Sequence, residues 1–198
     1  MNIIILFLLS IATVKASEQS LVFDFGNTSD RVQNWVLISD NIMGGISKAS
    51  VKYTDNTVIL QGDISLDNFG GFASLKTKFK AIDLSSYSGI KIRYKAVNQR
   101  FAFTLEETQN WTRPNYKKEF TSNKQDSWEI ATINFKDFKE YVIGEPTGDY
   151  MNLESLRNIL RLGIISIEKK KVHSRSKLTT LSFLLIQEVN CEEYIISM

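Results

Sequence analysis

The sequence is poor in the residues on which most metal sites, disulfide frameworks and catalytic centres depend. Its 198 residues include one cysteine, Cys191, one histidine, His173, and two prolines. A single cysteine excludes an intrachain disulfide, and a zinc site needs several Cys or His ligands. One histidine in a basic segment offers no Ser–His or Cys–His arrangement. We therefore expect no metal site, no cofactor and no enzymatic activity. A structural calcium bound by Asp and Asn oxygens stays an alternative that no loop spacing singles out.

Charge, linkers and long apolar segments are also scarce. The formal net charge is +2, which is too small to indicate a nucleic-acid partner, and no nucleic-acid-binding motif is visible. With few prolines and 10 glycines, no long disordered linker is expected. Beyond residue 16 no segment is apolar enough to cross a membrane. The length fits one domain with a single core.

The first 16 residues are a different kind of sequence. Residues 3–9 are an unbroken apolar run, shorter than the roughly 20 residues that span a bilayer. Val14 and Ala16 are the small residues that a signal peptidase favours, and the Arg-rich amphipathic pattern of a mitochondrial presequence is missing. We expect a secretory signal peptide at residues 1–16 and a domain over 17–198. The expected location is therefore secreted or periplasmic, with the mitochondrion as the alternative.

Alternation of apolar and polar residues indicates β-structure along the rest of the chain. In residues 90–96 apolar side chains alternate with Lys or Arg, and residues 101–105 repeat the pattern. Later runs at 128–135, 159–167 and 178–189 are rich in β-branched and large apolar residues. Short strands without a long helix predict a single-domain, all-β sandwich or jelly roll.

Three segments are expected to interrupt the strands. Residues 144–148 read as a turn, and residues 152–157 as one helical turn before a strand. The basic residues around His173, at 169–177, are expected to form an exposed hairpin loop.

Two glycine-rich segments about 20 residues apart stand out from this pattern. The first covers residues 39–47 after Trp35, and the second covers residues 62–74. Adjacent glycines allow φ > 0 and let a ligand or another backbone approach closely. The alternatives are tight structural loops or a partner-binding surface, which gains support if the two loops meet. The candidate partner-binding residues are Asp40, Gly44, Gly45, Ser47, Asn68, Gly70 and Gly71.

These two segments resemble the complex I intermediate-associated protein 30 family. Similar segments follow at 83–90, 128–138, 162–164 and 183–186, so the resemblance spans Phe23 to Val189. It implies a galactose-binding-like jelly-roll sandwich that acts as a chaperone in the assembly of NADH:ubiquinone oxidoreductase. The implied partner is a protein, such as a subunit of a membrane complex.

The resemblance is broken in one place. Residues 96–100 stand where the family commonly has a Gly-Asp-Gly turn, so no contact of that aspartate is transferred to this chain.

A third segment has the chemistry of a carbohydrate site. Aromatic rings stack on sugars, and Arg or Asn side chains bind hydroxyl groups. The alternative function is therefore a secreted carbohydrate-binding module. A purely structural explanation is that these aromatic side chains pack at a sheet edge. The candidate carbohydrate-binding residues are Trp111, Arg113, Asn115 and Tyr116. Asn27 and Asn110 begin N-glycosylation sequons, which would mark exposed loops in a eukaryotic secretory pathway.

Basic residues also alternate along two of the expected strands, at 76–80 and 91–95. They are either solvated strand faces or a basic stripe that faces an anionic partner.

Overall fold

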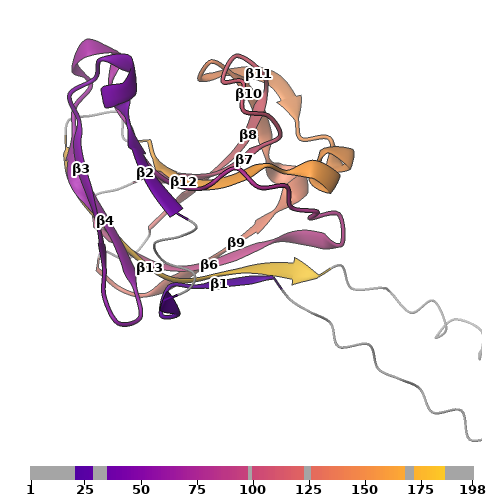
Figure 1. Cartoon of the computed structure of the whole chain (residues 1–198), viewed down its shortest axis with the longest axis horizontal. Helices are drawn as coiled ribbons and strands as arrows, with labels where there is room; N and C mark the ends of the chain where they lie inside the picture. The colour runs from indigo at the N-terminus through magenta and orange to yellow at the C-terminus, as the bar shows by residue number, and fades with distance from the viewer. Residues whose placement is uncertain (1–20, 29–34, 98–99, 123–125, 168–171, 186–198) are drawn as a thin grey trace, which may run out of the picture.

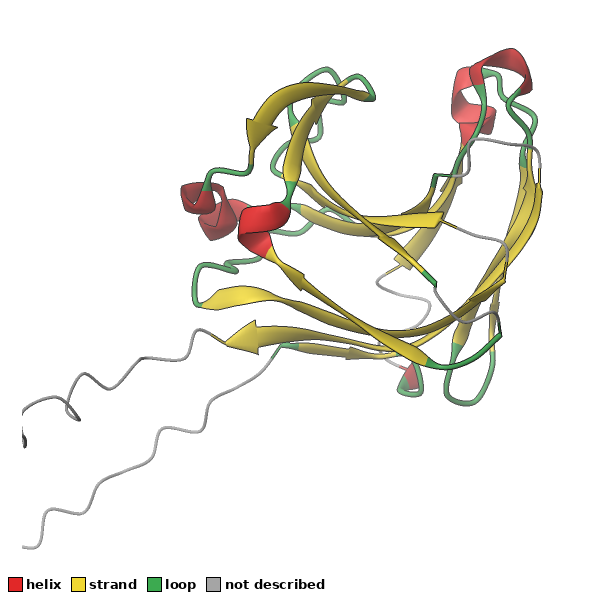
Figure 2. Ribbon diagram, turned by 180° about the vertical axis from the view of Figure 1, so that it is seen from behind, coloured by secondary structure: helices red, strands yellow, loops and turns green. Residues whose placement is uncertain are grey.

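The computed structural model describes residues 21–28, 35–97, 100–122, 126–167 and 172–185. The expected signal peptide at 1–16 and Cys191 lie outside the described residues. Within these ranges, thirteen strands form two antiparallel sheets that pack face to face (Figures 1 and 2). The predicted all-β, jelly-roll sandwich is thereby confirmed.

The first sheet has six strands. In spatial order they are β3 (Lys48–Tyr53), β4 (Val58–Ile64), β13 (Val172–Leu185), β6 (Tyr87–Val97) and β9 (Glu129–Asn134), and β1 (Val22–Asp24) pairs with β13.

The second sheet has seven strands. Their order is β11 (Glu145–Tyr150), β10 (Lys139–Val142), β8 (Asn115–Thr121), β7 (Arg100–Glu106), β12 (Arg161–Ser166), β5 (Ala73–Thr77) and β2 (Trp35–Ser39). This sheet is curved, and its concave face is turned away from the first sheet (Figure 1). The 3₁₀ turn η1 (Asp40–Met43) rises at one end of the concave face, and the β10–β11 hairpin rises at the other (Figures 1 and 2).

The core lies between the sheets and follows the predicted alternation. Ile90 and Ile92 of β6 and Phe103 of β7 are all 0% exposed, while the lysine and arginine neighbours of the isoleucines are exposed. Burying each such side chain contributes about 1.5–3 kcal/mol. Because these residues point inward, their neighbours on β7 point to the concave face.

The remaining 3₁₀ turns are η2 (Asp67–Phe69), η3 (Phe135–Asp137) and η4 (Leu153–Asn158). The predicted helical turn at 152–157 corresponds to η4, which the Asn152 side chain caps by accepting the N–H of Glu154 at 3.0 Å.

Residues 144–148 are not a turn, contrary to the sequence-based prediction. Only Ile143 and Gly144, with φ of +50° and +86°, make the turn, and β11 begins immediately afterwards. Its Pro146 is tolerated because β11 is an edge strand of its sheet.

The described part of the basic segment around His173 also differs from its prediction, and residues 169–171 lie outside the described residues. From Val172 onward it is strand, with His173 opposite Asp63 of β4 and Arg175 opposite Val97 of β6. Pairing on both sides gives this backbone its hydrogen-bond partners, and this tertiary context overrides the loop-like composition.

Candidate functional site

The two glycine-rich loops meet, and one buried carboxylate joins them. The side chain of Asp40, in η1, is 0% exposed. Its Oδ1 accepts the backbone N–H of Ser47 at 3.0 Å, and its Oδ2 accepts the Ser47 hydroxyl and the N–H of Gly71 at 2.7 Å. The Ser47 hydroxyl oxygen also accepts the N–H of Ser65 at 3.0 Å. We call this cluster of Asp40, Ser47, Ser65 and Gly71 the Asp40 junction.

The glycines of both loops are needed where they lie. A Cβ on Gly45 would come within 2.5 Å of the Asp40 Cγ, and one on Gly70 within 2.7 Å of its Oδ2. Gly71, with φ of +127°, and Gly44, with φ of +88°, have left-handed conformations that side chains rarely adopt. The glycine signature is therefore explained by close packing around the carboxylate.

The junction also sets the charge state of Asp40. Burial raises the pKa of its carboxyl, but the hydrogen bonds from Ser47, Gly71 and Phe72 outweigh burial and hold the pKa below its usual value.

Asn68, the remaining candidate of the second loop, has an exposed side chain and a left-handed backbone with φ of +56°. A direct role of these residues in partner binding stays a prediction.

A groove with a volume of about 370 Å³ lies over the concave face of the seven-stranded sheet. η1 contributes to one side of it, the β7–β8 loop and the β10–β11 turn contribute to other sides, and the strands of the sheet form its floor. The apolar side chains that line it are Ile38, Ile42, Met43, Phe72, Phe79, Trp111, Pro114, Ile143 and Ile165.

Four cationic side chains and one carboxylate also line the groove, a net charge of +3. The carboxylate, Glu106, is 2.5 Å from Lys76 Nζ through Oε1 and 3.9 Å from Arg161 Nη1 through Oε2. The other two cations, Arg113 and Lys117, make no ion pair within the described ranges. The groove therefore has more positive than negative charge.

The strand register explains how these cations come together. Lys76, Gly163, Thr104 and Lys117 lie in one row across β5, β12, β7 and β8. A Cβ on Gly163 would come within 2.5 Å of Thr104 Oγ1 and 2.8 Å of Lys76 Cγ. Glycine at this point leaves room for the two neighbouring side chains on the groove floor.

Lys117 has an unfavourable environment for its own charge. Burial lowers its pKa and the nearby Lys76 lowers it further, although Glu106 and other carboxylates oppose this shift. The Lys117 ammonium lies 4.7 Å from the ring centroid of Tyr141, a weak compensating cation–π contact. A negative charge placed in the groove would stabilise the ammonium.

The predicted carbohydrate-binding residues are divided between the groove and the core. Trp111, Arg113 and Asn115 line the groove. Tyr116 is 5% exposed and belongs to the core, and its hydroxyl donates to Glu107 Oε2 at 3.0 Å. The structure therefore brings three of the four residues together and separates Tyr116 from them.

Both sequon asparagines are exposed. The Asn110 side-chain oxygen accepts hydrogen bonds from the N–H of Thr112 at 3.0 Å and from the Thr112 hydroxyl at 2.8 Å. Asn110 also lines the groove. Glycosylation of either residue stays a prediction.

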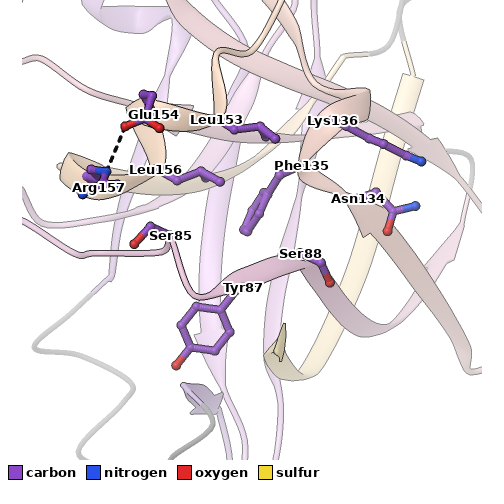
Figure 3. A pocket seen from close by; sticks show the side chains of 10 residues that line it. All are labelled: Ser85, Tyr87, Ser88, Asn134, Phe135, Lys136, Leu153, Glu154, Leu156 and Arg157. Atoms are coloured by element: carbon purple, nitrogen blue, oxygen red, sulfur yellow. Dashed lines mark hydrogen bonds and ion pairs between the residues drawn. The ribbon is translucent and has the colours of Figure 1, made fainter. Parts of the chain in front are cut away.

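A second hollow, of about 450 Å³, lies beside η3 and η4 (Figure 3). It contains none of the predicted site residues. Its Arg157 and Glu154 face each other at 2.9 Å, and the apolar Phe135 and Leu156 are buried in the core. Leu153 is the one exposed large apolar side chain among its lining residues. With its opposite charges paired and little exposed apolar surface, this hollow is a weaker candidate than the groove.

Sequence reasoning missed most of the groove lining. Ile42 and Met43 lie inside the first glycine segment, and the structural reading of that segment would pack Met43 beneath the sandwich rim, whereas Met43 is exposed on the groove. Lys117 and Arg161 gave no signal beyond ordinary alternation. Lys76 belongs to the basic stripe noted above, so that signal did include one groove residue.

The described ranges contain no group of three His, Cys, Asp or Glu residues that could hold a metal ion. No helix in this part of the chain is long and apolar enough to span a membrane.

The fold is similar to that of solved carbohydrate-binding modules. The family 11 module of the cellulosomal cellulase Lic26A-Cel5E of Clostridium thermocellum has a TM-score of 0.60 at 17% identity, over 88% of this chain and 99% of that module. The Clostridium thermocellum family 11 module in complex with a β-1,3-1,4-mixed-linked tetrasaccharide has a TM-score of 0.53 at 17% identity, over 79% and 92%. The agarase AgWH50C has a TM-score of 0.59 at 12% identity, over 86% of this chain and 25% of the agarase. These likenesses show a galactose-binding-like sandwich fold.

Sequence comparison gives the family. No curated protein shows significant similarity to the chain. The model of the complex I intermediate-associated protein 30 family matches residues 23–177, a range that includes both glycine-rich loops and the whole groove. The chain therefore belongs to the complex I intermediate-associated protein 30 family.

Proposed function

We propose that the chain is a non-catalytic, protein-binding module whose contact surface is the groove. The observation that carries this proposal is the exposed apolar surface on the groove: Ile42 is 74% exposed, Met43 57%, Trp111 69% and Ile143 56%. Gathered apolar surface marks interaction sites, and Trp and Met are enriched in protein interfaces. Aliphatic groups from both η1 and the β10–β11 turn suit a protein chain better than a sugar ring.

The family supports the finer proposal of an assembly role. The module would hold subunits of a partly assembled membrane complex, respiratory complex I in particular, by surface complementarity. The Asp40 junction fixes η1, so Ile42 and Met43 are held in place before a partner arrives. Such preorganisation reduces the entropy that is lost on binding.

Site-specific photo-crosslinking tests this proposal. A photoreactive amino acid at Met43 should capture a defined protein partner in the native source, identified by mass spectrometry. The matched control is the same amino acid at Ile130, which is 66% exposed on β9 of the other sheet. Recovery of the same proteins from both positions, or of none from Met43, would count against the groove as the contact surface. Capture of complex I subunits would support the assembly role.

Carbohydrate binding is the second candidate, favoured by one specific observation. The exposed indole of Trp111 shares the groove with Gln109, Asn110 and Asn115, whose amides can bind sugar hydroxyls. A structurally similar module binds a β-1,3-1,4-mixed-linked tetrasaccharide.

A glycan array and polysaccharide pull-downs separate the two candidates. Trp111→Ala should abolish any glycan signal, whereas Trp128→Ala, an exposed tryptophan beside β9, should leave it unchanged. A glycan signal that both variants retain would show that the groove is not the sugar site. Tyr116 is left intact because its loss would damage the core.

We also propose that the chain enters the secretory route. A protein purified from its native source should then begin at Ser17 and be found in the secreted or periplasmic fraction. A mitochondrial location would overturn this and would fit the complex I role directly.

A further inference from the structure

The positive charge of the groove is a local property of the molecule. The groove carries a net charge of +3, whereas the whole chain of 198 residues has a formal net charge of +2. The other residues of the sequence therefore sum to a formal charge of −1. A partner that approaches the groove meets an excess of positive charge there.

Glu106 does not neutralise this charge. Its two oxygens already face Lys76 and Arg161, while Lys117 and Arg113 have no carboxylate within ion-pair distance in the described part of the chain. Lys117 is half-buried, so solvent screens its charge less than it would at an open surface. One more carboxylate would give Lys117 an ion-pair partner on the groove floor.

We infer that the groove receives an extended, acidic segment of the partner protein, whose Asp or Glu carboxylate pairs with Lys117 while its neighbouring apolar side chains contact Met43 and Trp111. This inference rests on the proposed protein-binding function and specifies the chemistry of the partner. Charge-assisted bonds to a half-buried ammonium fix the register of the segment. The apolar contacts on either side supply most of the buried surface.

Two other ligand classes fit less well. A neutral polysaccharide leaves Lys117 without an anion. An acidic polysaccharide supplies the anion but has no aliphatic groups for Ile42, Met43 and Ile143, which are all exposed on the groove.

The test is selection of random-sequence, unstructured peptides on the whole protein, followed by affinity measurements on synthetic peptides. Selected peptides should be enriched in Asp or Glu next to apolar residues, and their affinity should fall as salt is raised. Lys117→Met should weaken binding about tenfold or more, the effect of losing one charge-assisted bond. Lys91→Met, an exposed lysine on β6 of the other sheet, should change it less than about twofold.

The possible failures are distinguishable. The selected peptides could lack acidic residues and still bind more weakly to an Ile42→Ser, Met43→Ser double variant. That result would overturn this inference and leave the proposed function standing. If neither Lys117→Met nor the Ile42→Ser, Met43→Ser double variant alters binding of the selected peptides, or if no peptide is selected, both this inference and the proposed function are overturned. Binding of polygalacturonate, lost in Lys117→Met, in place of peptides would replace the acidic protein segment with an acidic polysaccharide.

Discussion

Replacing Asp40 with asparagine should destabilise the protein by about 3–4 kcal/mol. The substitution keeps the shape of the side chain and the bond from the Ser47 N–H to Oδ1 at 3.0 Å. It places an amide N–H₂ where Oδ2 accepts the Ser47 hydroxyl and the Gly71 N–H at 2.7 Å. Each bond to a charged acceptor contributes about 1.5–3 kcal/mol, and the half-buried Gly71 N–H would face another donor. The Ser47 hydroxyl can reorient, so the cost is below the sum of two full bonds.

Urea unfolding followed by circular dichroism measures this change. The matched control is Asp83→Asn, an exposed carboxylate that accepts the Ser85 N–H at 2.8 Å, where asparagine can make the same bond. It should leave the free energy of unfolding almost unchanged, because the side chain is exposed. A loss below about 1 kcal/mol for Asp40→Asn would refute the view that this carboxylate joins the two loops.

The pH dependence of stability in the wild type and in Asp40→Asn gives an independent check. The folded-state pKa of Asp40 lies below its usual value, so its contribution to stability is complete above about pH 4 and is lost as pH falls through the folded-state pKa. The stability difference between wild type and Asp40→Asn should therefore shrink in acid. A difference that stays constant down to about pH 2 would contradict a role for the ionised carboxylate.

Three further predictions concern the groove. Gly163→Ala should destabilise by about 1–3 kcal/mol, measured by urea unfolding, because its Cβ would lie 2.5 Å from Thr104 Oγ1. Lys117→Met should leave the free energy of unfolding unchanged or raise it, because it removes a desolvated ammonium that has no ion pair in the described ranges. A clear loss of stability would mean that the charge stabilises the folded state. In protein from a eukaryotic secretory host, Thr112→Ala should strengthen peptide binding, since it removes the Asn110 sequon on the groove; equal affinities with proven glycan occupancy would contradict this.

The sandwich could be predicted because its signal is local. Ile90, Ile92 and Tyr94 alternate with cations, and a period of two places them on one face whatever their partners are. The limits of β11 and β13 could not be predicted in this way. β11 is an edge strand that contains Pro146, and β13 begins in a basic segment, so both depend on pairing with distant strands.

The groove was predictable only in part. Trp111 was identified because an aromatic residue in a polar loop is conspicuous, whereas Lys117 looks like any outward-facing strand residue. The groove collects such residues from several strands, and only the sheet order brings them together. The separation of Tyr116 from Asn115 follows from the period of two once β8 is known to begin at Asn115.

The glycines of the two loops and the apolar side chains that line the groove have different roles. Gly45, Gly70 and Gly71 pack around the buried Asp40, so they build the loops and leave little surface for a partner. The loop that they hold presents Ile42 and Met43, whose side chains make none of the hydrogen bonds of the Asp40 junction. The Asp40 junction therefore fixes the position of the loop at one side of the groove. The choice of partner depends on the side chains that line it, and here these combine exposed apolar groups with an excess of positive charge on the floor.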